Sequence, residues 1–369
     1  MTNKTILVLG AYGEAGAAIA RALCAIDAFD VVGAGRNREK LSALERSTEG
    51  LRTLQLDLMD QPALACAVGD AELVINCVGP FISTGVQTAR AALDAGAAYF
   101  DIASEQEHYR RLRALGAGPG QGRGLILTGV GAYPGLSGIL LKALLRRFPD
   151  AESAEMALIT GPHADPSAGG AQSVSGVVEL AFELSDLRDG LLHRLRPGRS
   201  RRFDFPAPFG AREVLTWPQL EVLAAAEAGA LSGLSTFAAL GGERLPSWLL
   251  LQALTFLRPT PESLSLSLVK RVLAARSARA TAAPDDATVN KGALIVSVHC
   301  GEETHTVQAI AHDLPAATAW LPVFAAKRWA TGALPRSGVT VPMDIFDADA
   351  VLTALREPWV SATFQLMDV

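Results

Sequence analysis

The first 130 residues alternate short apolar runs with segments whose apolar residues recur at helical spacing. The runs are four to six residues long and continuously apolar, which is too short for a helix and typical of strands that are buried on both faces. We therefore predict strands at residues 5–9, 31–34, 53–56, 73–78, 98–102 and 125–128.

The segments between these runs carry helix-forming residues with apolar side chains three and four positions apart. We predict helices at residues 14–25, 39–47, 61–68, 84–95 and 105–115. Such an alternation is typical of β-α-β units, in which helices cover both faces of a parallel sheet. The pattern predicts an α/β protein whose first domain, residues 1–130, is a Rossmann-type doubly wound parallel sheet.

The pattern changes after residue 129, where longer strand-like stretches are joined by loops rich in glycine and proline. These stretches are residues 154–161, 213–217, 262–269, 293–300 and 304–312. They predict a second, mixed α/β and largely antiparallel domain over residues 131–316. A helix at 318–331 follows, and residues 351–355 and 364–367 lie in the C-terminal segment after it. We expect this C-terminal segment, residues 317–369, to pack back on the Rossmann domain.

The composition supports two folded domains and excludes several functional classes. The 369 residues exceed the roughly 250–300 at which single cores stop growing. A net charge of −5 argues against a nucleic-acid partner, because phosphate binding needs basic surfaces. The most apolar stretch, residues 248–257, is shorter than the roughly 20 residues of a spanning helix, so no integral membrane segment is predicted. Contact with a membrane surface is left open.

The cysteines give no sign of a disulfide framework or a zinc ribbon, since they are scattered without a C-x-x-C pair: Cys24, Cys66, Cys77 and Cys300. A reducing cytoplasm fits this pattern. A metal site could be drawn from His299, Cys300 and His305, but the intervening Gly301 favours a hairpin turn. No metal site is predicted.

A glycine-rich turn follows the first strand and opens the first helix. It reads Gly10, Ala11, Tyr12, Gly13, Glu14, Ala15 and Gly16. Glycines at such a turn let backbone N–H groups approach a pyrophosphate at the positive end of the helix. The spacing is G-x-x-G-x-x-G rather than G-x-G-x-x-G, and a purely structural turn is the alternative. We predict a dinucleotide site.

The end of the second strand indicates which dinucleotide binds. NAD sites usually place an acidic residue here, whereas a 2′-phosphate requires a cation, and this chain has Arg36. NADP(H) is therefore favoured over NAD(H). Asp57, after the third strand, is placed to reach the adenine edge or to cap the next helix.

The ends of the later strands should form the reactive side of the site, because ligands bind beyond the carboxyl ends of parallel strands. We expect the nicotinamide beside Asn76, Cys77, Val78 and Gly79, which follow the fourth strand. The fifth strand leads to Asp101 and Glu105 on the same rim; for Asp101, helix capping is the alternative. Tyr133 lies where the chain leaves the first domain. Tyr133 and Asp101 are the candidate proton donors, with Glu105 and His108 in reserve.

With these motifs the chain resembles the saccharopine dehydrogenase-like family of NADP-binding oxidoreductases. The resemblance rests on residues 10–16, 34–36, 74–81, 95–101 and 129–137 and on a tail with Asp313, Gly332 and Gly338. It implies a Rossmann domain, a substrate and dimerisation domain, a homodimer and hydride transfer to a C=N bond. It also implies pyrophosphate binding by Gly10, Gly13 and Gly16. Saccharopine-forming members look like G-x-D-P-G near the domain crossing, where this chain has Tyr133, so the substrate is expected to differ.

The expected function is thus a cytoplasmic NADPH-dependent reductase acting on a small imine or a related unsaturated molecule. Two alternatives stay open: a trans-acting enoyl reductase of natural-product or lipid assembly, and a non-catalytic NADP(H)-sensing regulatory protein. The expected function does not explain one cluster of basic residues. Its arginines lie between Arg188 and Arg202, flanked by Asp189-Gly190 and Pro197-Gly198 turns, and form either a solvated hairpin or an anion-attracting rim.

Overall fold

The computed structural model of the chain describes residues 3–116, 124–162, 184–195, 199–239, 287–357 and 364–368. The chain divides into two compact units, each discontinuous in sequence. The first unit contains residues 1–104, 108–136 and 315–345, and the second contains residues 105–107, 137–314 and 346–369. The chain enters the second unit briefly at residues 105–107 and again after Leu136, whereas the predicted boundary stands at residue 130.

A seven-stranded sheet forms the centre of the first unit, and all of its strand pairs are parallel. Its order is β15-β6-β5-β4-β1-β2-β3. The strands are β1 (Lys4–Leu9), β2 (Phe29–Gly35), β3 (Arg52–Gln55), β4 (Leu73–Asn76), β5 (Ala98–Asp101), β6 (Leu125–Leu127) and β15 (Gly338–Thr340). The predicted doubly wound sheet is confirmed, and all six predicted strands are present within it.

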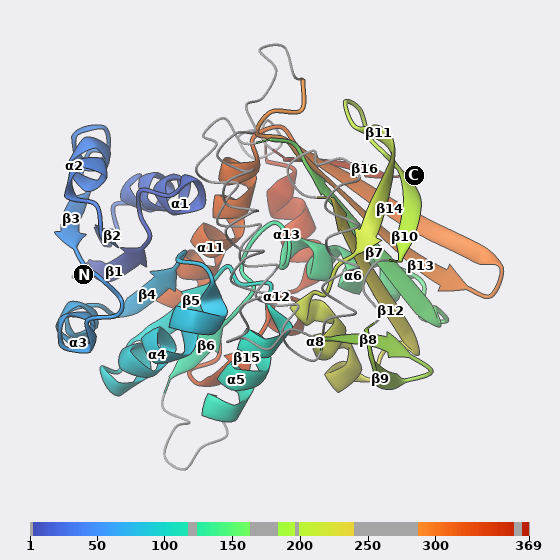
Figure 1. Ribbon diagram of the computed structural model, residues 1–369, viewed down its shortest axis with the longest axis horizontal. Helices are drawn as coiled ribbons and strands as arrows, with labels where there is room; N and C mark the ends of the chain where they lie inside the picture. Colours follow the sequence, from blue (N-terminus) through green and yellow to red (C-terminus); the bar gives the residue numbers. More distant parts are fainter. Residues whose placement is uncertain are drawn as a thin grey trace, which may run out of the picture. The chain divides into compact units, whose positions relative to one another are not determined.

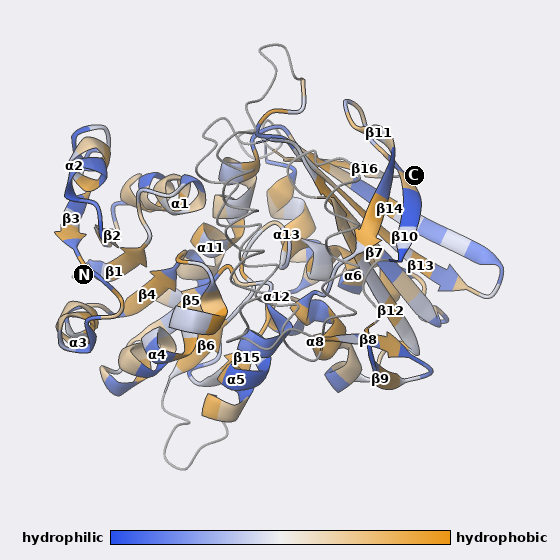
Figure 2. Cartoon of the chain, in the orientation of Figure 1, coloured by the Kyte–Doolittle hydropathy of each residue, from blue (hydrophilic) through white to orange (hydrophobic). Residues whose placement is uncertain are grey.

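Helices cover both faces of this sheet; Figure 1 shows α1 and α2 on one face and α3, α4 and α5 on the other. The helices are α1 (Glu14–Cys24), α2 (Arg38–Arg46), α3 (Gln61–Gly69), α4 (Phe81–Asp94), α5 (Gln106–Gly116), α11 (Leu314–Ala330) and α12 (Pro342–Ile345). One core cluster joins the strands to α3, α4 and α5 through buried residues such as Leu64, Ala89 and Leu112. Figure 2 accordingly shows β1 and β4 in hydrophobic colours.

The second unit is built on a mixed sheet of nine strands, as predicted. Its main path is β10-β11-β12-β7-β13-β14-β16, and β8 pairs with β12 and with β9. The β12–β7 pair is parallel and the other pairs are antiparallel. The strands are β7 (Ser153–Thr160), β8 (Ser185–Arg188), β9 (Leu191–Arg194), β10 (Ser200–Phe205), β11 (Gly210–Thr216), β12 (Gly233–Ala239), β13 (Gly292–Cys300), β14 (Glu303–Ala311) and β16 (Phe364–Asp368). The helices are α6 (Leu136–Arg147), α8 (Leu220–Ala228) and α13 (Ala348–Leu355).

The C-terminal segment corrects one expectation. Residues 315–345, with α11 and β15, belong to the first unit, but residues 346–369 belong to the second. There β16 pairs with β14, and Arg146 of α6 lies 3.0 Å from both Asp347 and Asp349 at the start of α13. The expected return of residues 346–369 to the Rossmann sheet is therefore wrong, because an open edge of the second sheet accepts the last strand.

Two predicted features lie outside the described residues: the strand at 262–269 and the apolar stretch at 248–257. Across the part of the chain that is described, no helix combines the length and apolar character needed to cross a membrane.

The basic cluster contains the hairpin that its turn residues predict. Asp189 and Gly190 connect β8 to β9 with φ angles of 51° and 73°, the left-handed conformation that tight hairpin turns require. The leucines after this turn are exposed, Leu191 by 65% and Leu192 by 46%.

Candidate functional site

The glycine turn after β1 is close-packed against the strands on either side of it. Gly10 has φ +76°, and a β-carbon there would lie 2.9 Å from the Val78 side chain. The N–H groups of Gly10 and Ala11 donate to the Ala34 carbonyl at 2.8 and 3.1 Å. These contacts fix the turn between β2 and the segment after β4.

The start of α1 packs directly on this turn. A β-carbon on Gly16 would lie 2.2 Å from the Gly10 carbonyl oxygen, so no side chain fits there. Gly13, the N-cap of α1, is exposed, and no side chain caps the helix. The first backbone N–H groups of a helix have no acceptor within the helix, and the helix dipole favours an anion at this end. This geometry fits a pyrophosphate.

The end of β2 presents an aromatic ring and a cation beside the turn. A β-carbon on Gly35 would lie 2.4 Å from the Tyr12 ring, so this ring packs on the Gly35 backbone. Lys40 Nζ lies 5.9 Å from the ring centroid. The next residue, Arg36, is exposed, and among the described residues its guanidinium has no ion-pair partner. Its cation is available to an anionic ligand.

Asp57 is exposed after β3, and its Oδ1 accepts a hydrogen bond from the Met59 N–H at 3.0 Å. The N-cap of α3 is instead Asp60, whose carboxylate accepts from the Ala63 N–H. The capping interpretation of Asp57 is therefore wrong. Its contact with an adenine edge stays a prediction.

The segment after β4 is anchored by Asn76, which is fully buried. Its amide donates to the Tyr99 hydroxyl at 3.1 Å, and its Oδ1 accepts from the Val78 N–H at 2.9 Å. Burial, followed by the charge of Asp101, raises the pKa of Cys77 to about 12, so its thiol stays protonated and is not a nucleophile. Asn76 therefore holds the backbone of Val78 in place beside the glycine turn.

Asp101, at the end of β5, is the centre of a fully buried polar network, referred to below as the Asp101 network. Its Oδ1 accepts from Thr128 Oγ1 at 2.6 Å and from the N–H groups of Ala103 and Gly129 at 3.1 and 3.2 Å. Its Oδ2 lies 2.8 Å from His108 Nε2. The network ties the carboxyl end of β5 to the end of β6 and to α5.

The electrostatics of this network keep Asp101 ionised. Burial alone would raise the pKa of Asp101, but His108, Thr128 and the Ala103 N–H outweigh burial and lower it. Burial and the Asp101 charge raise the pKa of Tyr99 well above its usual value. An ionised carboxylate with this many donors is a poor proton donor. The structure favours a positioning role for Asp101 over proton donation, and Asp101 does not cap α5.

The His108 ring occupies a tight space within the first unit. It lies 5.8 Å from the Phe81 ring, and a β-carbon on Gly85 would lie 2.2 Å from its Cε1. Its Nδ1 atom is buried, with no hydrogen-bond partner in the described residues. The absence of a side chain at Gly85 therefore makes room for the ring that pairs with Asp101.

The second proton-donor candidate, Tyr133, stands in a turn with a fixed backbone. The Gly131 N–H donates to the Pro134 carbonyl at 3.0 Å, and the Leu136 N–H donates to the Gly131 carbonyl at 3.0 Å. Gly135 has φ +116°, and a β-carbon there would lie 2.5 Å from the Gly131 oxygen. The Tyr133 side chain is half-buried and belongs, like Asp101, to the first unit, whereas Glu105 is buried and belongs to the second.

His299 and His305, the histidines of the candidate metal site, have other contacts. His299 Nδ1 lies 2.9 Å from Thr304 Oγ1, and the His305 ring stacks on Phe148 with centroids 3.6 Å apart. Gly301, with φ +59°, forms the predicted hairpin turn between β13 and β14. Within the described ranges, no group of three or more His, Cys, Asp or Glu side chains could hold a metal ion.

Comparisons with known proteins agree with this geometry. Residues 6–118 match the family model of the saccharopine dehydrogenase NADP binding domain. Apo saccharopine dehydrogenase (L-Glu forming) from Saccharomyces cerevisiae aligns over 100% of both chains, with 13% sequence identity and a TM-score of 0.64. Biliverdin reductase from a Synechocystis species, solved with biliverdin and NADP+, covers 95% of each chain at 13% identity with a TM-score of 0.45, too low to establish a shared fold.

No curated protein sequence matches the chain significantly. The domain match covers the glycine turn, Arg36, the segment after β4 and Asp101, and the yeast enzyme aligns with the full length of the chain. Residues 6–118 are thus similar to the saccharopine dehydrogenase NADP binding domain, and the chain has the fold of the yeast saccharopine dehydrogenase.

Proposed function

We propose that the chain is an NADPH-dependent reductase that transfers a hydride to the C=N bond of a small imine. The observation that carries this proposal is an uncapped helix N-terminus above an obligatory glycine turn, with the exposed Arg36 cation beside it. The resemblance to the family supports the choice of a C=N substrate. We further propose a homodimer that works in the cytoplasm.

In the proposed mechanism the residues of this chain bind, align and supply one proton. The turn at Gly10, Gly13 and Gly16 binds the pyrophosphate, and Arg36 pairs with the 2′-phosphate. Asn76 and Asp101 hold the segments after β4 and β5 in place. NADPH, when bound, supplies the hydride to the imine carbon. Tyr133 donates its phenolic proton to the imine nitrogen and regains a proton from water, so imine, NADPH and a proton give amine and NADP+.

The proposed reaction is tested by following the loss of NADPH fluorescence with a panel of small imines, formed from 2-oxo acids and amines, and with enoyl thioesters. Oxidation with imines alone supports the proposal. Oxidation with enoyl thioesters alone would assign the chain to enoyl reduction instead. Tight NADPH binding without oxidation by any member of the panel would favour the sensor.

For Arg36 we expect the Arg36→Ala variant to bind NADPH at least about tenfold more weakly while NADH binding is unchanged. Losing a charged phosphate contact typically costs about 1.5–3 kcal/mol. Arg38→Ala is the matched control, because Arg38 is also exposed and begins α2. Fluorescence titration measures both dissociation constants. Equal weakening of NADPH and NADH would contradict the role of Arg36.

For Tyr133 we expect Tyr133→Phe to lower turnover at least tenfold with NADPH affinity and melting temperature preserved. The ring and its packing remain, and only the hydroxyl is lost; general acid catalysis is typically worth about 10² to 10⁴ in rate. Tyr109→Phe, which removes a buried hydroxyl elsewhere in the first unit, is the control. Unchanged turnover in Tyr133→Phe would assign the proton to water, and a large fall in its melting temperature would assign Tyr133 a structural role.

A further inference from the structure

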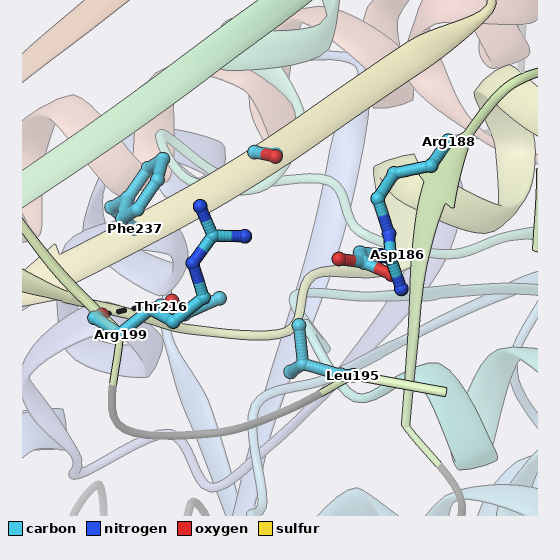
Figure 3. A pocket seen from close by; sticks show the side chains of 7 residues that line it. Asp186, Arg188, Leu195, Arg199, Thr216 and Phe237 are labelled. Carbon is cyan, nitrogen blue, oxygen red and sulfur yellow. Dashed lines mark hydrogen bonds and ion pairs between the residues drawn. The ribbon is translucent and has the colours of Figure 1, made fainter. Parts of the chain in front are cut away.

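A cavity of about 300 Å³ opens in the second unit, between the β8–β9 hairpin and the strands β11 and β12. It is lined by Asp186, Arg188, Leu195, Arg199, Thr216, Ser235 and Phe237 (Figure 3). Both arginines come from the basic cluster whose role the cofactor site leaves unexplained. The cavity therefore joins charged, hydroxyl and apolar side chains in one place.

The two arginines of the cavity differ in their partners. Arg188 Nε donates to Asp186 Oδ1 at 3.2 Å, so this pair is close to neutral. Arg199 has no ion-pair partner among the described residues, and Figure 3 shows its guanidinium extending between Phe237 and Asp186. The charges of Arg188, Arg199 and Asp186 leave the cavity with a net charge of about +1. A bound monoanion would neutralise this charge.

The backbone of Arg199 is fixed although its side chain is exposed. Its carbonyl accepts from the Thr216 N–H at 2.8 Å and from Thr216 Oγ1 at 2.9 Å. Thr216 in turn belongs to β11, which pairs with β12 through Thr216 and Phe237. A guanidinium held at its base loses less freedom when it binds a ligand, which favours a specific contact.

We propose that this cavity binds the carboxylate of a small organic acid. Arg199 would hold the carboxylate through its two parallel N–H groups, and Leu195 and Phe237 would contact the apolar part of the acid. A dianion fits less well, because Asp186 repels the second charge. The volume is at the lower end of ligand sites, which limits the acid to a small one. The site lies within the second unit and is independent of the proposed cofactor chemistry.

The test is calorimetric titration of the full chain with benzoate, and with benzamide as the neutral molecule of the same shape. We expect benzoate to bind and benzamide to bind at least tenfold more weakly. Arg199→Met should weaken benzoate at least tenfold. Arg202→Met changes an exposed arginine of β10, the strand that begins directly after Arg199; Arg202 does not line the cavity, so benzoate affinity should be unchanged. Equal loss in both variants, or no benzoate binding at millimolar concentration, would overturn the proposal.

A second variant changes the affinity in the opposite direction. Asp186→Asn keeps the size of the side chain and removes its negative charge, so the cavity gains net positive charge and benzoate should bind several-fold more tightly. A merely structural role of Asp186 predicts weaker binding and a lower melting temperature. Weaker benzoate binding by a folded Asp186→Asn variant would therefore contradict the charge argument. Because no cofactor is present in the titration, these results stand whether or not NADPH reduction is found.

Discussion

The Gly16→Ala variant is expected to lose at least about 100-fold in NADPH affinity, or about 2.8 kcal/mol of binding free energy. The added methyl group would lie 2.2 Å from the Gly10 oxygen and 2.9 Å from the Gly10 carbonyl carbon. Both are backbone atoms of the turn, so relief requires α1 to move away from Gly10. That movement displaces the N–H groups on which a pyrophosphate depends.

The matched control is Gly69→Ala at the end of α3, where a β-carbon meets nothing within 4 Å. Fluorescence titration with NADPH measures the affinity, and circular dichroism shows whether the sheet is retained. Native affinity in a folded Gly16→Ala variant would mean that the turn is not the phosphate site. Gly13→Ala is an informative intermediate, since its methyl would lie 3.3 Å from the Gly10 oxygen and would interfere mainly with a bound pyrophosphate.

The Rossmann unit could be predicted almost completely because its signals are local. Parallel strands covered on both faces are continuously apolar, and the helices between them show a regular apolar stripe, so each element is recognisable alone. The predicted helix at 84–95 begins three residues earlier in the structure, at Phe81, with Pro80 as its N-cap. The strand β15, which pairs with β6, and the short helix α12 were not predicted.

The second unit was less predictable because several of its strands are polar or partly exposed. β9 and β10 carry arginines and exposed positions in place of a clear alternation, so they were interpreted as a hairpin region without strand limits. Residues 364–367 were expected to pack on the first domain, but nothing in the sequence of β16 indicates that it pairs with β14 of the second sheet. The sequence indicated a basic cluster that could attract anions, but it did not show that Arg188 and Arg199 line one cavity together with Phe237.

The candidate cofactor turn and Arg36 could be proposed from the sequence because their residues are consecutive or follow a predicted strand directly. The Asp101 network could not be predicted from the sequence, because its members come from separate elements: His108 from α5 and Thr128 from the end of β6. Because parallel strands end on the same edge of a sheet, Asp101 could be predicted to lie at that edge. The sequence could not show that the Asp101 carboxylate is buried and accepts hydrogen bonds from several donors.

The Asp101→Ala variant is therefore expected to lose about 3–5 kcal/mol of unfolding free energy, because several buried groups lose their common hydrogen-bond partner. The change leaves the buried donors of His108, Thr128 and Gly129 without an acceptor. Asp57→Ala is the control, since it removes an exposed carboxylate at the end of β3 and should cost less than about 1 kcal/mol. Urea denaturation followed by circular dichroism measures both.

The pH dependence of this loss distinguishes the positioning role from proton donation. Because the folded pKa of Asp101 is lowered, its stabilisation is fully present above the unfolded value of about 3.9 and is lost as pH falls through the folded pKa. The stability difference between wild type and Asp101→Asn should thus be constant above about pH 5 and shrink below about pH 4. A difference that grows in acid would show a protonated, raised-pKa carboxyl in the folded protein. That result would return Asp101 to the role of proton donor, with Tyr133 orienting the substrate.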